Sequence, residues 1–156
     1  MRLTKVDGER LWLQVSPREK RLLLEIFQLY PLIDTTYHRA TRSADPRVDQ
    51  KLLEEALAAL NRENRERLDA FVQDPQRFAQ TKEGCCLVVE FQNLEWLLQV
   101  VNDIRVGSWL KLGMPDQKSE KRLVLNLANV PYIVALELCG LLEAILLDAG
   151  SRRPAT

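Results

Sequence analysis

The sequence predicts an α+β protein that is mainly α-helical, with four or so packed helices and a small antiparallel β element that includes an N-terminal hairpin. Apolar residues recur at helical spacing over most of the chain, whereas the first segment alternates instead, and prolines and glycines separate the segments. A chain of 156 residues suits one domain. We expect that domain to span residues 1–150, followed by a frayed tail at residues 151–156.

The hairpin is predicted from residues 3–15, LTKVDGERLWLQV, in which two alternating segments flank Asp7-Gly8. This dipeptide suits a type I′ turn, whose two central residues both need positive φ. Alternation would place three apolar side chains of the second strand on one face of the sheet: Leu11, Leu13 and Val15.

The first helix is predicted to begin at Pro17 and to end near Tyr30, before Pro31. Ser16 and Glu19 have the spacing of a capping box, and proline is favoured at the first helical position. Its apolar stripe consists of Leu22, Leu23, Ile26, Phe27 and Tyr30.

A second, longer helix is predicted from Pro46 to Gln73, with Asp45 as its N-cap. Its apolar stripe includes Leu52, Ala56, Leu60 and Phe71. The charged patch from Arg62 to Arg67 mixes both signs, which is typical of a solvated face.

A strand is predicted from about Cys86 to Phe91, where it would pair with the N-terminal hairpin. A third helix follows, with Asn93 as its cap and Gly113 at its end. Residues 123–127, LVLNL, fit a short strand, a helix or a loop.

The last helix is predicted from Asn129–Pro131 to about Asp148, before Gly150. Its predicted apolar stripe consists of Val134, Leu138, Leu141 and Ile145. The apolar run 123–147 also raises the possibility of a membrane span. Glu137 and Glu143 argue against one, because an acidic residue near a bilayer centre costs about 2.5–3.5 kcal/mol. We therefore expect a buried helix and no membrane partner.

Charge and cysteine content limit the function classes. With 22 basic and 22 acidic residues the formal net charge is zero, so no basic excess points to nucleic acid. Charged residues near the start, among them Arg2 and Lys5, interrupt any apolar run, so we expect no cleavable signal. The three cysteines then predict a reduced, cytoplasmic protein. Adjacent Cys85 and Cys86 do not have the spacing of a zinc site, and with His38 as the sole histidine we expect neither a metal nor a cofactor.

The polar segment LIDTTYHRATRSADP, residues 32–46, has two interpretations. Tyr37, His38, Arg39 and Arg42 would suit a small anion site, but a solvated connecting loop explains the same composition and is favoured. A nucleic-acid role would rest on Arg39, Arg42 and the patch from Arg62 to Arg67. We rank it last and expect no nucleic-acid partner.

Charged groups within the apolar stretch VVNDIRVGSWL, residues 100–110, need partners. At about 100° per residue, Arg105 borders the apolar stripe, while Asp103 lies about 160° away from it and cannot easily pair with it. We expect Arg105 to be neutralised by a carboxylate of the last helix, Glu137 before Glu143, because a buried unpaired charge is very unfavourable. Asp103 would bond backbone amides or the indole N–H of Trp12 or Trp109.

Two functions fit these candidate residues, Asn102, Asp103, Arg105, Glu137 and Glu143. The favoured one is a non-enzymatic protein-interaction module. It could form a homodimer through the last helix, because a helix that is apolar around most of its surface lies either at the centre of a fold or against another subunit. The alternative is a small enzyme or anionic-ligand-binding protein that uses the Arg/Asp/Glu cluster. Gly107 and Gly140 suggest points where another backbone approaches closely.

Two blocks carry a family resemblance: DGERLWLQVSPREKRLLLEIF at residues 7–27 and EWLLQVVNDIRVGSWLKLGMPD at 95–116. The residues that match are Trp96, Leu97, Asn102, Asp103, Arg105, Leu112 and Gly113. With them the chain resembles an uncharacterised bacterial family, known best from actinobacteria as a domain of unknown function, over about Asp7 to Asp116. Family members tend to be encoded beside the adaptor of the Clp protease, so the resemblance implies a partner in protein turnover. It implies no catalytic residues.

Overall fold

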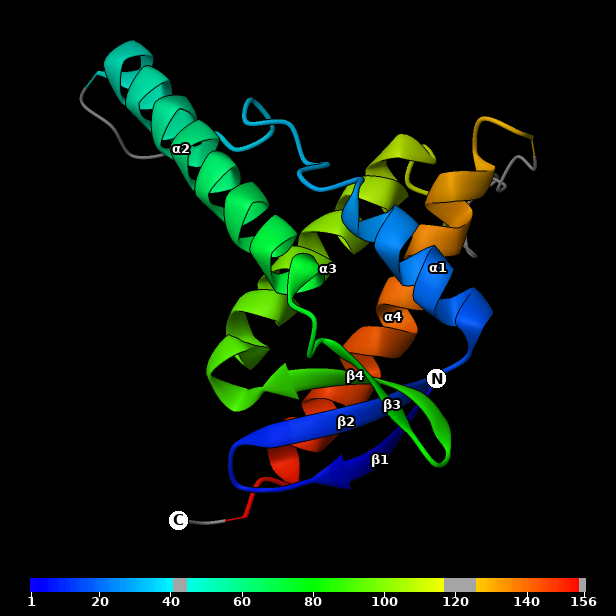
Figure 1. Ribbon diagram of the computed structural model, residues 1–156. Coiled ribbons are helices and arrows are strands. Elements are labelled where there is room, and N and C mark those ends of the chain that lie inside the picture. The colour runs from blue at the N-terminus through cyan, green and yellow to red at the C-terminus, as the bar shows by residue number, and fades with distance from the viewer. Residues whose placement is uncertain (41–44, 117–125, 155–156) are drawn as a thin grey trace.

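The computed structural model describes residues 1–40, 45–116 and 126–154. Within them lie four helices and one four-stranded antiparallel sheet, which confirms the mainly helical α+β class (Figure 1). In chain order the elements are β1 (Arg2–Val6), β2 (Arg10–Val15), α1 (Pro17–Phe27), α2 (Pro46–Gln73), β3 (Phe78–Thr81), β4 (Gly84–Glu90), α3 (Phe91–Lys111) and α4 (Val130–Ser151). Of residues 123–127, the first three lie outside the described part, and Asn126 and Leu127 belong to no strand.

The sheet has the strand order β1-β2-β4-β3. As predicted, the strand before α3 pairs with the N-terminal hairpin, with Leu11 opposite Val89 and Leu13 opposite Leu87. That strand spans Gly84–Glu90 rather than Cys86–Phe91, because Phe91 already begins the helix. β3 was not predicted, since its four residues are too few to show a clear alternation.

The turn between β1 and β2 differs from the predicted type I′ turn. Among the described residues, positive φ occurs at Gly84, Gly113 and Met114, and not at Asp7 or Gly8. Instead the Asp7 carboxylate accepts the backbone N–H groups of Glu9 and Arg10, at 2.9 and 2.8 Å. Asp7 therefore acts as an Asx turn that closes the loop without a left-handed residue.

Helix α1 has the predicted capping box between Ser16 and Glu19, but it ends at Phe27 rather than near Tyr30. The reason is a side chain of α2. Arg65 Nη1 donates hydrogen bonds to the carbonyl oxygens of Phe27 and Tyr30, at 2.7 and 3.0 Å. These bonds give additional donors to carbonyls at and just beyond the helix end, where the Phe27 carbonyl also accepts the Tyr30 N–H at 3.4 Å.

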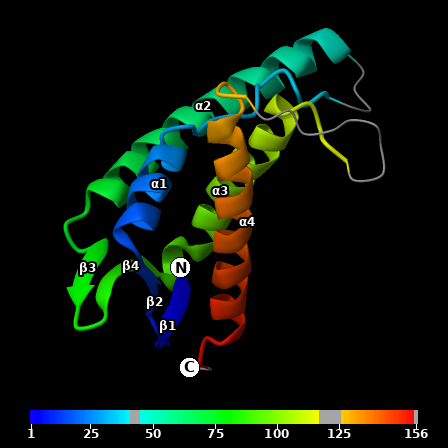
Figure 2. The ribbon, with the colours of Figure 1, turned by 90° about the vertical axis from the view of Figure 1, so that its right-hand side faces the viewer.

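The hydrophobic core lies between one face of the sheet and helices α1, α3 and α4 (Figures 1 and 2). Leu11, Leu13 and Val15 point into it and are 0–2% exposed, as the alternation predicts. Gly107 of α3 lies at a tight contact, because a Cβ placed there would be 2.7 Å from Leu32 Cβ. The predicted close approach is thus confirmed at Gly107. At Gly140 no other part of the described chain approaches, since a Cβ there would meet nothing within 4 Å.

Helix α2 extends beyond the rest of the molecule, and its N-terminal half projects away from the core (Figure 1). Only Leu68 and Phe71 of this helix are buried. The predicted stripe is therefore not a core stripe along its whole length: Leu52 is 57% and Leu60 49% exposed.

Helix α4 runs alongside α3, and its buried residues are Ala135, Cys139, Leu142, Leu146 and Ala149. This stripe lies one residue on from the predicted one, of which Leu141 is 45% exposed. The helix ends at Ser151, inside the predicted tail. Beyond it, Arg153 Nε donates to the Gly8 carbonyl at 3.3 Å, so the end of α4 is tied to the hairpin. Residues 155–156 of the predicted tail lie outside the described part.

Candidate functional site

Arg105 and Glu143 form an ion pair between α3 and α4. Arg105 Nε lies 2.9 Å from Glu143 Oε2, although the angle is not that of a hydrogen bond. Nη2 donates to the Asn102 side-chain oxygen at 3.3 Å. The predicted carboxylate from the last helix is therefore present. Its identity is corrected: Glu137 was expected first, but it lies about 120° around α4 from Glu143 and is exposed.

The pair lies at the edge of the core rather than inside it. The Glu143 side chain is 13% exposed and the Arg105 side chain 42%. Burial raises the pKa of Glu143 above its ordinary value, and the charge of Arg105 offsets this only in part. The pair thus closes the α3–α4 boundary while one side of the guanidinium faces water.

Asp103 binds a different part of the chain, as its position around the helix predicts. Its Oδ1 accepts the backbone N–H of Leu32 at 3.1 Å, in the segment after α1. Burial raises the pKa of this carboxyl, while the N–H groups of Leu32 and Ile33 act in the opposite direction. Of the partners considered for Asp103, the structure selects backbone amides. The carboxylate fixes the segment that packs on Gly107.

The candidate residues do not converge on one cleft. Asp103 faces the segment after α1, Arg105 and Glu143 meet between α3 and α4, and Asn102 and Glu137 are exposed. General acid–base chemistry needs groups within hydrogen-bond reach of one reacting atom. This arrangement gives the alternative of an Arg/Asp/Glu catalytic cluster no geometric support.

Arg77, the one buried lysine or arginine among the described residues, was missed in the sequence. Its Nε donates to the Phe71 carbonyl at 3.0 Å, Nη1 donates to the Val88 carbonyl, and its guanidinium lies 3.7 Å from the Phe71 ring centroid. Two carboxylates complete the cluster: Glu90 at 2.9 Å and Asp74 at 3.3 Å. Burial alone would raise the pKa of Glu90, but hydrogen bonds from Arg77 and Asn93 outweigh it, and the pKa is lowered. Arg77 thus joins the end of α2 to β4. The prediction that Asn93 caps α3 is wrong: Asn93 lies within the helix, whose N-cap residue is Glu90, and its side chain donates to the Glu90 carboxylate.

The charged patch from Arg62 to Arg67 is not wholly a solvated face. Asn64 accepts the Trp96 indole N–H at 3.1 Å and donates to the Tyr30 hydroxyl at 3.0 Å. The Arg67 guanidinium lies 4.2 Å from the Trp96 ring centroid. These contacts attach α2 to the segment after α1 and to α3. The sequence pattern does not reveal them, because the same residues also fit an exposed helix.

Several other sequence candidates have structural explanations. Cys85, Cys86 and Cys139 are free and buried, and burial, followed by Glu143, raises the pKa of the Cys139 thiol to about 12. No group of His, Cys, Asp or Glu in the described residues is placed to hold a metal ion. Tyr37 and His38 make an edge-on ring contact at 5.4 Å in an exposed loop, and Arg42 lies outside the described residues.

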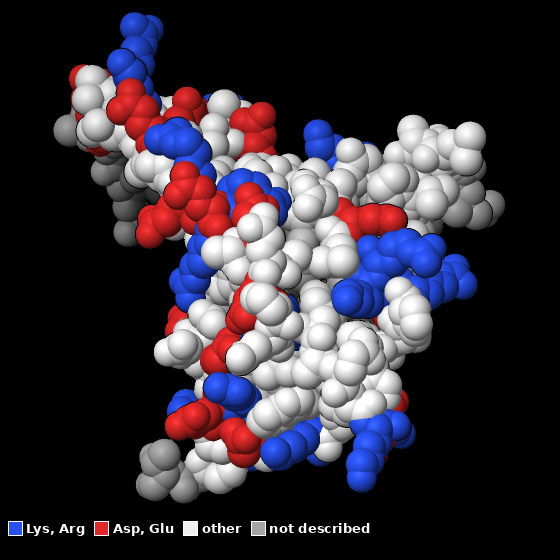
Figure 3. All heavy atoms as spheres, viewed as in Figure 1, with Lys and Arg blue, Asp and Glu red and all other residues white. Residues whose placement is uncertain are grey.

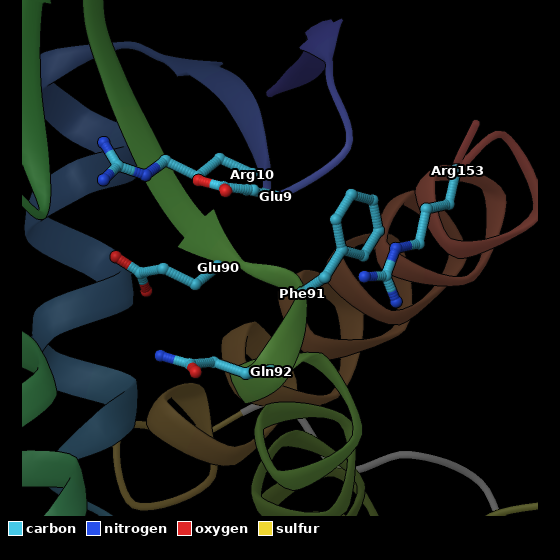
Figure 4. Close-up of a pocket in the computed structure, with 6 residues that line it drawn as sticks. All are labelled: Glu9, Arg10, Glu90, Phe91, Gln92 and Arg153. Atoms are coloured by element: carbon cyan, nitrogen blue, oxygen red, sulfur yellow. The ribbon is translucent and has the colours of Figure 1, made fainter. Parts of the chain in front are cut away.

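One cavity, of about 390 Å³, lies where β2, β4, α3 and the end of the chain meet (Figure 4). Arg10 and Glu90 extend to one side of it, whereas Arg153 lies beside the Phe91 ring on the other. The guanidinium of Arg153 is 4.8 Å from the ring centroid. Because these polar groups point apart, the cavity has no common point at which they would bind a ligand.

Helix α4 leaves apolar side chains uncovered along one side. Its most apolar 18-residue window has a mean hydropathy of 2.0, but only 22% of that window is buried. Among the described residues it is the one helix that is long and apolar enough to cross a membrane by length and composition alone, a property that core helices of soluble proteins share. The expectation of a buried helix is therefore wrong for one side of it, which we call the α4 outer face: Ile133, Glu137, Gly140, Leu141, Ala144 and Leu147. Leu141 and Leu147 are 45% and 62% exposed.

A smaller hollow adjoins this face. It measures about 280 Å³ and is lined by Arg105, Val106 and Trp109 of α3 and by Leu136 of α4. Trp109 is 37% exposed, and its indole N–H donates to the Pro115 carbonyl at 3.2 Å. In the view of Figure 3, side chains of both signs cover α2, and Lys and Arg side chains gather over α1. That face shows no one-sign patch along α2 of the kind nucleic acid requires.

Comparison with known proteins returns no matching family model, no matching curated protein and no matching solved structure. The function is therefore argued from the chain itself.

Proposed function

We propose that the protein is a non-enzymatic protein-interaction module that self-associates through the α4 outer face. The observation that carries this is the exposure of Leu141 and Leu147, at 45% and 62%, on a helix with a window of mean hydropathy 2.0. Contiguous exposed apolar surface on a folded domain marks an interaction site. Covering it removes apolar area from water, at about 25 cal/mol per Å².

Water-soluble self-association is favoured over membrane insertion by the charges on α4. Glu137 lies on the outer face, and Glu143 is paired with Arg105 of α3. An acidic side chain near the bilayer centre opposes insertion by about 2.5–3.5 kcal/mol. The three free, buried cysteines are consistent with a reducing compartment, and we propose a cytoplasmic location. A role in protein turnover is supported by the family resemblance of residues 7–116.

Sedimentation equilibrium tests the proposal. The native chain is expected to reach the mass of a dimer within the micromolar range, and Leu141→Lys is expected to remain a monomer. Leu52→Lys is the matched control, because Leu52 is 57% exposed on the projecting half of α2. A native chain that is monomeric at every workable concentration contradicts the proposal, as does a dimer lost in Leu52→Lys but kept in Leu141→Lys.

A further inference from the structure

The ion pair with Glu143 leaves part of the Arg105 guanidinium unused. Its Nε lies 2.9 Å from Glu143 Oε2, and its Nη2 donates to the Asn102 side chain at 3.3 Å. Its Nη1 donates no hydrogen bond to any of the described residues, and the side chain is 42% exposed. A guanidinium carries five N–H donors in a fixed fork, which matches a carboxylate through two parallel hydrogen bonds. Arg105 can therefore bind a second carboxylate.

The hollow beside Arg105 places an apolar surface next to this cation. Its volume is about 280 Å³, and its other lining residues are Val106, Trp109 and Leu136. Ligand pockets in proteins measure roughly 300–1,000 Å³, so this hollow lies at their lower limit. It suits a small ligand with a single ring rather than one of the size of a nucleotide.

Helix geometry sets the distance between the two ends of such a ligand. Arg105 and Trp109 lie one turn apart on the same side of α3, so their Cβ atoms are about 5–6 Å apart. Trp109 is 37% exposed, and its indole N–H donates to the Pro115 carbonyl at 3.2 Å, which fixes the orientation of the ring. Aromatic rings favour edge-to-face or offset contacts with a second ring. A ligand that fits both side chains has a carboxylate and an aromatic ring joined by a short chain.

Glu143 does not block a second acid on the same guanidinium. In this chain Arg77 contacts two carboxylates through different nitrogens, Glu90 at 2.9 Å and Asp74 at 3.3 Å. The fold thus already contains one arginine shared by two acids. Glu143 and the second acid repel each other, however, so removal of the Glu143 charge should strengthen binding.

We propose that the hollow between α3 and α4 binds a small aromatic monocarboxylate, with its carboxylate on the free edge of Arg105 and its ring against Trp109. Val106 and Leu136 cover the ring from the other sides. None of these four residues belongs to the α4 outer face. The site therefore does not depend on self-association.

Nuclear magnetic resonance of the ¹⁵N-labelled chain, titrated with 3-phenylpropionate, tests the site. The indole N–H signal of Trp109, assigned with Trp109→Phe, is expected to shift with a dissociation constant of about 1 mM or below. The indole signals of Trp12 and Trp96 should stay in place. The neutral isostere 3-phenylpropionamide should bind at least about tenfold more weakly, because it cannot form a charge-assisted pair. Equal binding of acid and amide, or no shift of the Trp109 signal well above that concentration, overturns the proposal.

The same titration of Leu141→Lys separates this site from self-association. Leu141 lies on the α4 outer face and does not line the hollow, so the dissociation constant for the acid should be unchanged. Loss of acid binding in a monomeric Leu141→Lys would contradict the independent site. A native chain that is monomeric but binds the acid would leave this proposal intact and overturn only the proposed function.

Substitutions identify the group that binds the carboxylate. Arg105→Met is expected to remove the preference for the acid over the amide, and Arg105→Lys to keep only part of it, since lysine lacks the fork of donors. Glu143→Gln should tighten acid binding at least about twofold. Arg21→Met is the matched control, because it removes an exposed arginine of α1 and changes the net charge equally. An unchanged preference in Arg105→Met, or weaker acid binding in Glu143→Gln, contradicts the assignment.

Discussion

Arg77 and Arg105 lie at opposite ends of α3: Arg77 pairs with Glu90, just before the helix, and Arg105 belongs to its second half. The fold provides the two guanidinium groups with different numbers of hydrogen-bond and ion-pair partners. Arg77 has a side chain 5% exposed and meets two carboxylates and two carbonyl groups. Arg105 has a side chain 42% exposed and meets one carboxylate and one amide. The difference teaches that depth sets the number of partners. A guanidinium removed from water needs protein acceptors for its donors, whereas a half-buried one keeps water as a partner.

Removing Arg77 should have the largest effect. We expect Arg77→Met to lower the free energy of unfolding by about 3–5 kcal/mol, because it leaves two buried carbonyls and two carboxylates without their cation. Urea unfolding measures the loss. Arg77→Lys keeps the charge but not the fork of donors, so it should fall between Arg77→Met and the native chain. A loss below about 1 kcal/mol would show that this cluster is not what joins α2 to β4.

The second half of α3 should depend more on close packing than on its ion pair. Gly107→Ala would place a Cβ 2.7 Å from Leu32 Cβ, so we expect a loss of about 1–3 kcal/mol from overpacking. Gly8→Ala is the control, since a Cβ there meets nothing within 4 Å, and it should stay within about 0.5 kcal/mol of the native chain. Equal thermal stability of the two variants would mean that the Leu32 segment yields without cost.

Breaking the Arg105–Glu143 pair should cost little. We expect Arg105→Met to change the free energy of unfolding by about 0–1 kcal/mol, since the Arg105 side chain is 42% exposed and its ion pair is partly screened by water. A double-mutant cycle with Glu143→Gln should show weaker coupling than the corresponding Arg77→Met and Glu90→Gln cycle. Stronger coupling at Arg105 would reverse the comparison.

The smallest expected effect is on the pH dependence of stability, which should have opposite signs for Glu90 and Glu143. The pKa of Glu90 is lowered in the fold, so its ionised form adds stability above its unfolded value near 4.5, and this is lost as pH falls. The pKa of Glu143 is raised, so the native chain loses stability as pH rises through that range. The cost of Glu90→Gln should therefore grow from pH 3 to pH 7, and that of Glu143→Gln should shrink. Unfolding curves at several pH values test this, and parallel trends would contradict it.

Local sequence signals predicted much of the fold. The capping box of Ser16 and Glu19, the alternation of Leu11, Leu13 and Val15, and the angular separation of Asp103 from Arg105 all depend on residues close together in the chain. These periodicities follow directly from strand and helix geometry.

The failures share a different cause. Nothing near Arg77 in the sequence indicates Val88 or Glu90 as partners, because a β turn and strand pairing bring them together. Periodicity likewise identified apolar stripes on α2 and α4 but could not determine which side the fold covers. Leu52 and Leu141 therefore looked like core residues and are exposed. To predict Glu143 rather than Glu137 as the partner of Arg105, one must know which face of α4 packs against α3. The sequence of α4 alone does not determine that face.

The central claim is that a second copy covers the α4 outer face, and hydroxyl-radical footprinting measures this most directly. Leu147 and Leu52 are 62% and 57% exposed in the single chain, so they should react comparably in dilute protein. As concentration rises through the dimer range, we predict that modification of Leu147 falls while that of Leu52 stays constant. Equal reactivity of the two leucines at every concentration would contradict the account.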